Sequence, residues 1–476
     1  MSALWTIDDM AAAMKAARSG TLPGDIGGIS IDSRTLGKGD AFFAIHGENR
    51  DGHDFVEAAL KAGAGVAIVA RDSLSRFSPD APLLAVDDAL EGLRALARAA
   101  RARSRAKIIA VTGSVGKTGT KEALRLALGA DGETHASAAS YNNHWGVPLS
   151  LARMPAGVKY AVFEIGMNHA GEITPLTQLV RPHVAIITTI QPVHLEYFGT
   201  LEKIADAKAE IFTGIEAGGA AELNRDNGQY ARLAAAAKAA GIARIVSFGQ
   251  DAKADARLLR HSLQAESSTV EARIFGADVT YKLGAPGLHL VFNSLAVLAA
   301  AALAGADLAL AALALNDLKP APGRGARVDL AVPGGSALLI DESYNANPAS
   351  MAAAIALLGQ APLGPNGRRI AVLGDMLELG GEGPALHRHL VKPLEAAKVD
   401  LVFCSGPQMR ALWEALPSNH RGGYADSAAA LEPSVLAAIR NGDAVMVKGS
   451  LGSKMAPIVK ALQRQFAKAA ALDVQG

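Results

Sequence analysis

The stretch Val111-Thr112-Gly113-Ser114-Val115-Gly116-Lys117-Thr118 decides how this chain folds, because it joins a strand to a helix through a glycine-rich turn. Ile108 to Val111 before it is a continuous apolar run, and Lys121 to Leu128 after it has the pattern of a helix. Such a turn lets backbone N–H groups approach phosphate oxygens, and the start of the helix adds partial positive charge. Lys117 can reach the outer phosphates, and the Thr118 hydroxyl can bind Mg²⁺. The predicted phosphate-binding residues are Gly113, Ser114, Val115, Gly116, Lys117, Thr118 and Gly119.

The stretch is a variant of the phosphate-binding loop. The general pattern G-x-x-x-x-G-K-[ST] is not met, because Val111 stands where its first glycine is expected. The shorter form T-G-x-x-G-K-T is present. A GKT triplet also occurs by chance in ordinary loops, but the strand before it and the helix after it favour nucleotide binding.

Length and composition limit the classes of protein that fit. A chain of 476 residues predicts two to four domains, at about 100–200 residues each. The 47 basic and 46 acidic residues leave a net charge of +1, which gives no support to a nucleic-acid or membrane-surface partner. The single cysteine, Cys404, fits a reducing compartment.

No stretch of the sequence predicts membrane insertion. Met1 to Gly20 contains Asp8, Asp9 and Lys15 and lacks the long apolar core of a signal peptide. Leu295 to Ala304 is apolar but shorter than the roughly 20 residues of a membrane span. We therefore expect a soluble, cytoplasmic protein.

Apolar runs and turn residues predict three α/β domains. Residues 1–104 form a small N-terminal domain that ends in a long helix from Leu90 to Arg105. Residues 105–325 form a central domain in which strands alternate with helices, which predicts a mostly parallel sheet with helices on both faces. Residues 326–476 follow the Pro- and Gly-rich stretch Lys319 to Arg327, a natural hinge, and have the pattern of a Rossmann-like open sheet. The predicted strands are Ile29 to Asp32, Ala41 to Ile45, Val66 to Ala70, Leu83 to Val86, Ile108 to Val111, Ala161 to Ile165, Val184 to Ile190, Ala220 to Leu223, Ala337 to Ile340, Ile370 to Leu373, Leu401 to Cys404 and Ala444 to Val447.

Three polar residues of the central domain are candidates for chemistry. Ligands of open α/β sheets bind beyond the carboxyl ends of the strands, and Glu164 and His194 follow such strands. Lys208 lies in a helical segment. Each has an ordinary alternative: a solvated loop acid, a structural histidine and a surface lysine. Only their combination favours a catalytic site.

Several strings, taken together, resemble the Mur ligases. They are TGSVGKTGTKE (112–122), SYNNHWGVPLSL (140–151), EIGMNHAGEI (164–173), HLEYFGTLEKIADAKAEIF (194–212), DESYNANPASM (341–351), IDSRTLGKGDAFFAIHGENRDGHDF (31–55), LGDMLELG (373–380) and VKGSLGSKM (447–455). The resemblance covers nearly the whole chain. SYNANP (343–348) and VKGS (447–450) resemble the member of the family that adds a dipeptide.

The resemblance implies an ATP-dependent amide ligase that works through an acyl phosphate. Lys117 lies between the β- and γ-phosphates in this interpretation, Thr118 and Glu164 hold one Mg²⁺, and His194 holds a second. Lys208 matches the lysine that becomes carbamylated. An anion at that position binds the second Mg²⁺, whereas an ammonium would repel it.

The resemblance also assigns the nucleotide and substrate contacts. Asn293 matches an adenine contact, Arg324 an arginine that reaches the ATP phosphates, and Asp341 an acid near the ribose. Leu288-His289 stands where the family usually has Arg-His, and Glu342 replaces a common second Asp. Ser33, Arg34, Asp51 and His53 are expected at the uridine diphosphate end of the substrate, and Asn142 and Asn143 at its muramoyl–peptide end.

The implied substrates are UDP-N-acetylmuramoyl-tripeptide and D-Ala-D-Ala, handled by a monomeric enzyme. The sequence leaves open whether the third residue of the tripeptide is diaminopimelate or lysine. Two alternatives remain at this point. One is a related ligase that adds a single amino acid, and the other is a non-catalytic ATP-binding or switch protein, because a phosphate-binding loop alone is common to both classes.

Overall fold

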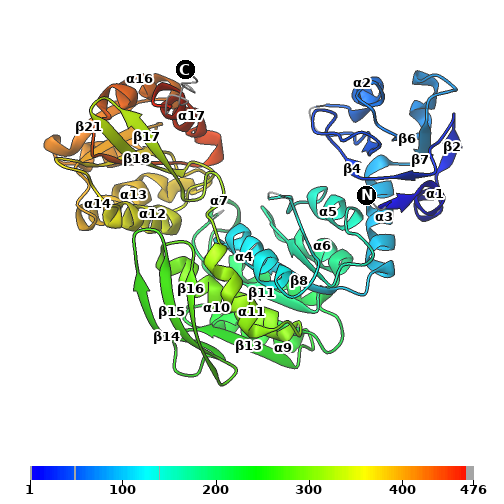
Figure 1. Cartoon of the computed structure of the whole chain (residues 1–476), viewed down its shortest axis with the longest axis horizontal. Helices are drawn as coiled ribbons and strands as arrows, with labels where there is room; N and C mark the ends of the chain where they lie inside the picture. The colour runs from blue at the N-terminus through cyan, green and yellow to red at the C-terminus, as the bar shows by residue number, and fades with distance from the viewer. Residues whose placement is uncertain (1–2, 48–49, 139, 194, 468–476) are drawn as a thin grey trace, which may run out of the picture.

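The computed structural model describes residues 3–47, 50–138, 140–193 and 195–467. Within them the chain forms three domains, each built on its own sheet (Figure 1). The N-terminal and C-terminal domains lie on the same side of the central domain in this view and are separated from each other (Figure 1). The α/β class and the three-domain organisation predicted from the sequence are confirmed.

The N-terminal domain contains a five-stranded sheet in the order β2-β7-β6-β5-β4, in which only β2 is antiparallel to its neighbour. Its strands are β2 (Ala17–Ser19), β4 (Ile29–Ser30), β5 (Ala41–Phe43), β6 (Val66–Ala70) and β7 (Leu83–Val86). Its helices are α1 (Ile7–Met14), α2 (Val56–Lys61) and α3 (Ala89–Arg103), and β1 (Trp5–Thr6) pairs with β3 (Asp25–Ile26). The long helix α3 leads directly into the central domain.

The central domain has a nine-stranded sheet in the order β16-β15-β14-β13-β12-β11-β8-β10-β9. The strands from β9 to β14 are parallel, and β14, β15 and β16 form an antiparallel extension at one edge. The strands are β8 (Lys107–Thr112), β9 (Thr134–Ala136), β10 (Tyr160–Glu164), β11 (Val184–Ile187), β12 (Ala220–Asn224), β13 (Arg244–Gly249), β14 (Ala256–Leu263), β15 (Ser268–Ile274) and β16 (Ala277–Leu283).

Helices cover both faces of this sheet. The helices are α4 (Lys117–Gly129), α5 (Gly146–Ala152), α6 (Ile173–Val180), α7 (Leu195–Phe198), α8 (Leu201–Ala209), α9 (Tyr230–Ala239), α10 (Leu288–Leu303) and α11 (Leu308–Ala314). Ile109 and Val111 of β8 pack into the core beneath α4 and α10, whereas Ile108 and Ala110 face the core that includes residues of α5 and α6. Side chains alternate between the faces of a strand, so the apolar run from Ile108 to Val111 in β8 requires a helical layer on each side.

The C-terminal domain has a six-stranded sheet in the order β17-β18-β22-β19-β20-β21, with only β17 antiparallel. Its strands are β17 (Ala326–Val332), β18 (Gly335–Glu342), β19 (Arg369–Gly374), β20 (Leu401–Ser405), β21 (Arg421–Ala425) and β22 (Ala444–Lys448). Its helices are α12 (Pro348–Gln360), α13 (Gly383–Arg388), α14 (Val391–Ala396), α15 (Arg410–Ala415), α16 (Ala428–Ala438) and α17 (Ala456–Gln465). No helix in the described part of the chain is long and apolar enough to cross a membrane.

Two predicted elements end elsewhere in the structure. The strand predicted from Val184 to Ile190 stops at Ile187, because the next residues turn to bind the phosphate loop. The helix predicted from Lys121 begins at Lys117, directly after the glycine-rich turn. Both differences bring backbone groups to the candidate site.

Candidate active site

The turn between β8 and α4 has the conformation of a phosphate-binding loop. Gly113 has φ +146° and Gly116 has φ +88°, values that favour glycine. A Cβ atom on Gly113 would overlap the side chain of Thr188. The Lys117 Nζ folds back to donate to the carbonyl oxygen of Gly113 at 2.8 Å, so the ammonium lies over the turn.

The loop after β11 holds this turn from the other side. The Thr188 hydroxyl donates to the carbonyl oxygen of Val115 at 2.6 Å, and the Ser114 N–H donates to the carbonyl oxygen of Thr189 at 2.9 Å. Ser114 Oγ also accepts from the N–H of Gln191 at 2.9 Å. These contacts fix the turn without using the backbone N–H groups at the start of α4, which remain available for an anion.

Glu164 ends β10, directly beside the strand that leads into the turn, since it pairs in register with Val111. Its carboxylate is 1% exposed. Oε1 accepts from the Asn142 Nδ2 at 2.7 Å, whereas Oε2 is buried and has no hydrogen-bond partner among the described residues. A buried carboxylate oxygen without a partner costs free energy unless a cation or a donor meets it. Glu164 therefore has the character of a metal ligand.

Lys208 lies on α8 with 2% of its surface exposed and forms no ion pair with another described residue. Burial, and after it the charge of Lys117, lowers the pKa of Lys208 well below its usual value. Burial likewise lowers the pKa of Lys117, which the carboxylate of Glu164 partly offsets. The electrostatic influence of Glu164 on Lys117, and of Lys117 on Lys208, places the three predicted site residues in one environment, whereas their catalytic roles stay predictions. His194, the fourth predicted member, lies outside the described residues.

Two of the predicted contacts with ATP, Asn293 and Arg324, lie next to the phosphate loop. The Asn293 amide on α10 lies against Gly116, because a Cβ atom on Gly116 would be 2.9 Å from Asn293 Nδ2. Arg324 reaches from the interdomain stretch to Ser140, with its Nη2 3.3 Å from Ser140 Oγ, and its guanidinium lies over the ring of Tyr344. Ser140 Oγ is in turn 3.3 Å from the Thr118 hydroxyl. Arg324 therefore already reaches the region of the phosphate loop.

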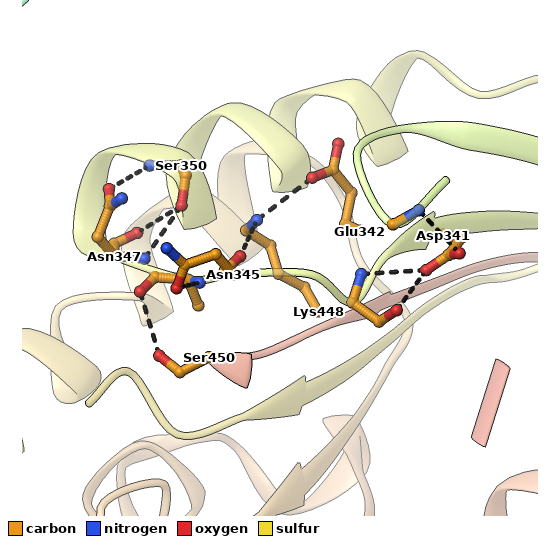
Figure 2. A network of polar contacts seen from close by, with 10 residues as sticks. Asp341, Glu342, Asn345, Asn347, Ser350, Lys448 and Ser450 are labelled. Carbon is orange, nitrogen blue, oxygen red and sulfur yellow. Dashed lines mark hydrogen bonds and ion pairs between the residues drawn. The ribbon is translucent and has the colours of Figure 1, made fainter. Parts of the chain in front are cut away.

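Asp341, near the carboxyl end of β18, and its neighbours form a network of polar contacts in the C-terminal domain (Figure 2). One carboxylate oxygen of Asp341 accepts from the N–H of Gly323 at 3.0 Å, and the other accepts from the hydroxyl of Ser343 at 2.6 Å. Lys448, which is buried, donates to Glu342 Oε2 at 3.2 Å and to the carbonyl oxygen of Asn345 at 2.9 Å. The ion pair of Glu342 in β18 with Lys448 in β22 was not predicted, although the two residues lie in the strings 341–351 and 447–455 that resemble the family.

The structure gives Asn142 and Asn143 internal partners. Asn142 holds Glu164, and Asn143 Oδ1 accepts from the N–H of Gly146 at 2.9 Å at the start of α5. Both residues therefore position the loop between β9 and α5, next to the carboxylate of Glu164. A direct contact with the muramoyl peptide stays a prediction.

In the N-terminal domain, the buried His53 forms a polar pair with the partly exposed Asp51. His53 Nε2 accepts from the N–H of Ala70 at 3.0 Å, so its Nδ1 carries the proton and donates to Asp51 at 2.6 Å. Burial raises the pKa of Asp51, but the hydrogen bonds from His53 and Arg76 outweigh it and hold that pKa well below its usual value. Arg34 pairs with Asp32 on the surface, and Ser33 lies beside it in the same turn.

Comparison with known proteins assigns the whole arrangement to one group. The family models described as "Mur ligase family, catalytic domain", "Mur ligase middle domain" and "Mur ligase, glutamate ligase domain" match residues 25–101, 111–301 and 324–451. The chain is 35% identical to the UDP-N-acetylmuramoyl-tripeptide–D-alanyl-D-alanine ligase of Escherichia coli, over 91% of this chain and 93% of that protein. It is 33% identical to the ligase of the same name from Rickettsia prowazekii, over 90% and 94% of the two chains.

Solved structures agree with this assignment. The crystal structure of MurF from Acinetobacter baumannii superposes with a TM-score of 0.82 at 31% identity, covering 97% of this chain and 99% of that one. MurF from Thermotoga maritima, solved in complex with ADP, gives a TM-score of 0.75 at 26% identity over 93% and 98% of the two chains.

Proposed function

The chain belongs to the Mur ligase family, and on that premise we propose that it joins D-Ala-D-Ala to UDP-N-acetylmuramoyl-tripeptide with ATP in the cytoplasm. Relatives that carry the name of this ligase match nearly the full length of the chain. The observation that carries the proposal is the convergence of Lys117, the half-satisfied Glu164 and the buried Lys208 at one edge of the central sheet. A protein that only binds a nucleotide has no need of the last two.

The chemistry consists of two transfers. The terminal carboxylate of the tripeptide attacks the γ-phosphorus of ATP, which gives an acyl phosphate and ADP. The amine of D-Ala-D-Ala then attacks the acyl carbon, an amide forms, a proton is lost and phosphate leaves. Transfer of a phosphoryl group depends on positioning and charge neutralisation, which Lys117 and the N–H groups of the loop from Gly113 to Thr118 supply.

The residues present fit Mg²⁺. The unpartnered Oε2 of Glu164 and the hydroxyl of Thr118 are oxygen ligands of the kind this ion prefers. The described residues hold no cluster of three or more His, Cys, Asp or Glu side chains, and Mg²⁺ bound by one or two side chains plus phosphates requires none. When bound, the ion neutralises charge on the phosphates. Glu164 and Thr118 hold one ion in this proposal, and Lys208 and His194 a second.

Lys208 serves this second ion as a carbamate. Its lowered pKa keeps a larger share of the amine unprotonated at neutral pH, and the neutral amine is the form that adds to CO₂, with loss of a proton. The product is an anion in place of a cation, held at a buried position where an ammonium has no described carboxylate partner. Burial thus favours the modification that a metal site requires.

The three domains divide the ligands in this proposal, with boundaries at 1–104, 105–325 and 326–476. Asn293 contacts the adenine, Asp341 lies near the ribose and Arg324 reaches the phosphates, consistent with their positions around the loop. The uridine diphosphate end belongs to the N-terminal domain near Ser33, Arg34, Asp51 and His53. The dipeptide belongs to the C-terminal domain, where Lys448 and Ser450 lie next to SYNANP.

An acceptor comparison tests the proposal against its alternatives. Purified protein with ATP, Mg²⁺ and UDP-N-acetylmuramoyl-tripeptide should release phosphate with D-Ala-D-Ala and form the pentapeptide product. With D-Ala, L-lysine or diaminopimelate in its place, kcat/KM should be about ten- to a hundredfold lower, because buried polar groups of the dipeptide site would lack partners. Equal use of a single amino acid would indicate a related ligase, and nucleotide binding without phosphate release would indicate a non-catalytic protein.

A further inference from the structure

Trp145 is a large aromatic side chain with 40% of its surface exposed. By contrast, Trp5 is 3% exposed and Trp413 is partly buried in the C-terminal domain. Trp145 follows Asn143 in the loop between β9 and α5 and stands directly before the first residue of α5. None of the chemistry described above uses its indole ring.

One end of this loop is fixed at the reacting centre. The Asn142 Nδ2 donates to the carboxylate of Glu164 at 2.7 Å, and the N–H of Gly166 donates to the carbonyl oxygen of Asn142 at 2.8 Å. Trp145 is therefore three residues from a side chain that touches the metal-binding carboxylate.

The other end is fixed to the N-terminal domain. The carbonyl oxygen of Trp145 accepts from the N–H of Leu149 in α5. Ala152, the last residue of α5, accepts a hydrogen bond at its carbonyl oxygen from the indole N–H of Trp5 at 2.8 Å. The next residue, Arg153, donates from Nε to the carbonyl oxygen of Ile29 at 2.7 Å. Trp5 and Ile29 both belong to the N-terminal domain. Trp145 thus lies on the segment that connects Glu164 to the N-terminal domain.

The proposed substrate has its uridine diphosphate at the N-terminal domain and its reacting carboxylate at Glu164. Its middle part must therefore pass along the segment that carries Trp145. The middle part of the proposed substrate is a sugar ring. One face of a pyranose carries C–H groups, and aromatic faces bear partial negative charge, so the two surfaces are complementary. The His144 ring meets the indole edge-on, with centroids 5.6 Å apart and an interplanar angle of 72°, which restricts how the indole can turn.

We propose that the indole of Trp145 is a stacking subsite for the pyranose ring of the muramoyl substrate. This subsite rests on the proposed function, because it assumes that the substrate spans from the N-terminal domain to Glu164. It assigns binding of the sugar to Trp145, while Asn142 and Asn143 position the loop.

Steady-state kinetics give the first test. Trp145→Ala should raise KM for UDP-N-acetylmuramoyl-tripeptide about tenfold. Its kcat and its KM for ATP should stay within about twofold of the wild type, since the contact is the same in the ground state and the transition state. Trp145→Phe should recover most of the loss, because a smaller aromatic face remains. Trp413→Phe is the matched control and should leave every constant unchanged. An unchanged KM in a folded Trp145→Ala protein would overturn the subsite.

Fluorescence gives the second test and separates the sugar from the uracil ring. In the Trp413→Phe protein without ATP, UDP-N-acetylmuramoyl-tripeptide should shift Trp145 emission to shorter wavelength and reduce its quenching by acrylamide. UDP alone should do neither. Equal protection by UDP would assign the stacking to uracil, and no protection by saturating tripeptide substrate would remove the contact altogether; either result overturns the proposal. Failure of the proposed function is seen separately, as the absence of phosphate release by the wild-type protein with all substrates.

Discussion

The indole N–H of Trp5 donates to the carbonyl oxygen of Ala152 at 2.8 Å and so ties the N-terminal domain to α5 of the central domain. Leu149 and Ala152 of α5 belong to the same apolar core as Met10, Phe43 and other residues of the N-terminal domain. The guanidinium of Arg103 lies over the Trp5 ring and donates to the carbonyl oxygens of Leu4 and Met154. The two domains therefore share a continuous core.

A shared core predicts two moving bodies rather than one for each of the three domains. When an ATP analogue and UDP-N-acetylmuramoyl-tripeptide bind, the C-terminal domain should approach the other two about the stretch from Lys319 to Arg327. Fluorescence energy transfer between dyes on Ala58→Cys and Ser434→Cys should increase, whereas transfer between Ala58→Cys and Lys238→Cys should not change. The only native cysteine, Cys404, is buried and will not compete for the dyes. A large change in the second pair would contradict the shared-core argument.

Replacement of Lys117 should remove catalysis and leave the fold intact. Within the described part of the chain, the Lys117 ammonium donates to the carbonyl oxygens of Gly113 and Ser114, and we expect it to turn to phosphate when ATP binds. Lys117→Ala should lower kcat by at least about a hundredfold with an unchanged circular dichroism spectrum. Lys107→Ala, at the exposed start of the strand β8 that leads into the loop, should behave as the wild type. Near-normal turnover in a folded Lys117→Ala protein would refute the phosphate site.

Activity should depend on CO₂ through Lys208. The Lys208→Ala protein should be inactive and partly rescued by acetate, which restores a carboxylate at the metal. Because the pKa of Lys208 is lowered, its amine is unprotonated at a lower pH than an exposed lysine, and carbamylation should persist at neutral pH. Lys203→Ala on the exposed face of α8 is the control. A mass measurement that finds a free amine at Lys208 in active protein kept under bicarbonate would contradict this interpretation.

Glu222 should make the protein less stable as pH rises. It is completely buried in β12, and neither carboxylate oxygen has a hydrogen-bond partner in the part of the chain that the structure describes. Burial, and after it the charge of Asp255, raises the pKa of Glu222 well above its ordinary value of 4.5. The folded state therefore keeps the proton that the unfolded state releases above pH 4.5, so the free energy of unfolding falls as pH increases.

The test compares melting temperatures of Glu222→Gln and the wild type from pH 5 to pH 8. The melting temperature of Glu222→Gln relative to that of the wild type should rise with pH, because the amide side chain has no proton to lose. Glu57→Gln, on the exposed face of α2, should show no such trend. A constant difference across this range would show that Glu222 is not held protonated by the fold.

Sequence reasoning found most of the parallel strands because each of these is short, apolar and followed by a turn residue, but it missed the parallel strands β9, β13 and β21. It did not predict β14, β15 and β16, because these strands alternate apolar residues with charged ones such as Arg257, Arg273 and Lys282, and much of their outer face is exposed. β14 pairs parallel with β13, whereas β15 pairs antiparallel with both β14 and β16, an arrangement outside the βαβ pattern that revealed the predicted strands.

The candidate site likewise has one part that the sequence predicted and another that only the structure shows. The phosphate loop, Glu164 and Lys208 carry recognisable strings, and the structure brings them to one edge of the sheet. The orientation of Glu164 by Asn142, the contact of Ser114 with Gln191 and the ion pair of Lys448 with Glu342 join residues 22 to 106 positions apart. Spacing along the chain does not reveal such contacts, since they depend on how loops at the ends of separate strands meet.

Oxygen transfer from substrate to phosphate tests the central claim most directly. UDP-N-acetylmuramoyl-tripeptide labelled with ¹⁸O in its terminal carboxylate is incubated with the protein, unlabelled ATP, Mg²⁺ and D-Ala-D-Ala, and the released phosphate is analysed by mass spectrometry. A ligase that works through an acyl phosphate must transfer one carboxylate oxygen to each phosphate, because that oxygen leaves with phosphorus when the amine attacks. We predict phosphate that carries one ¹⁸O in proportion to the pentapeptide formed. Pentapeptide formation with unlabelled phosphate would contradict the acyl-phosphate mechanism proposed for this site.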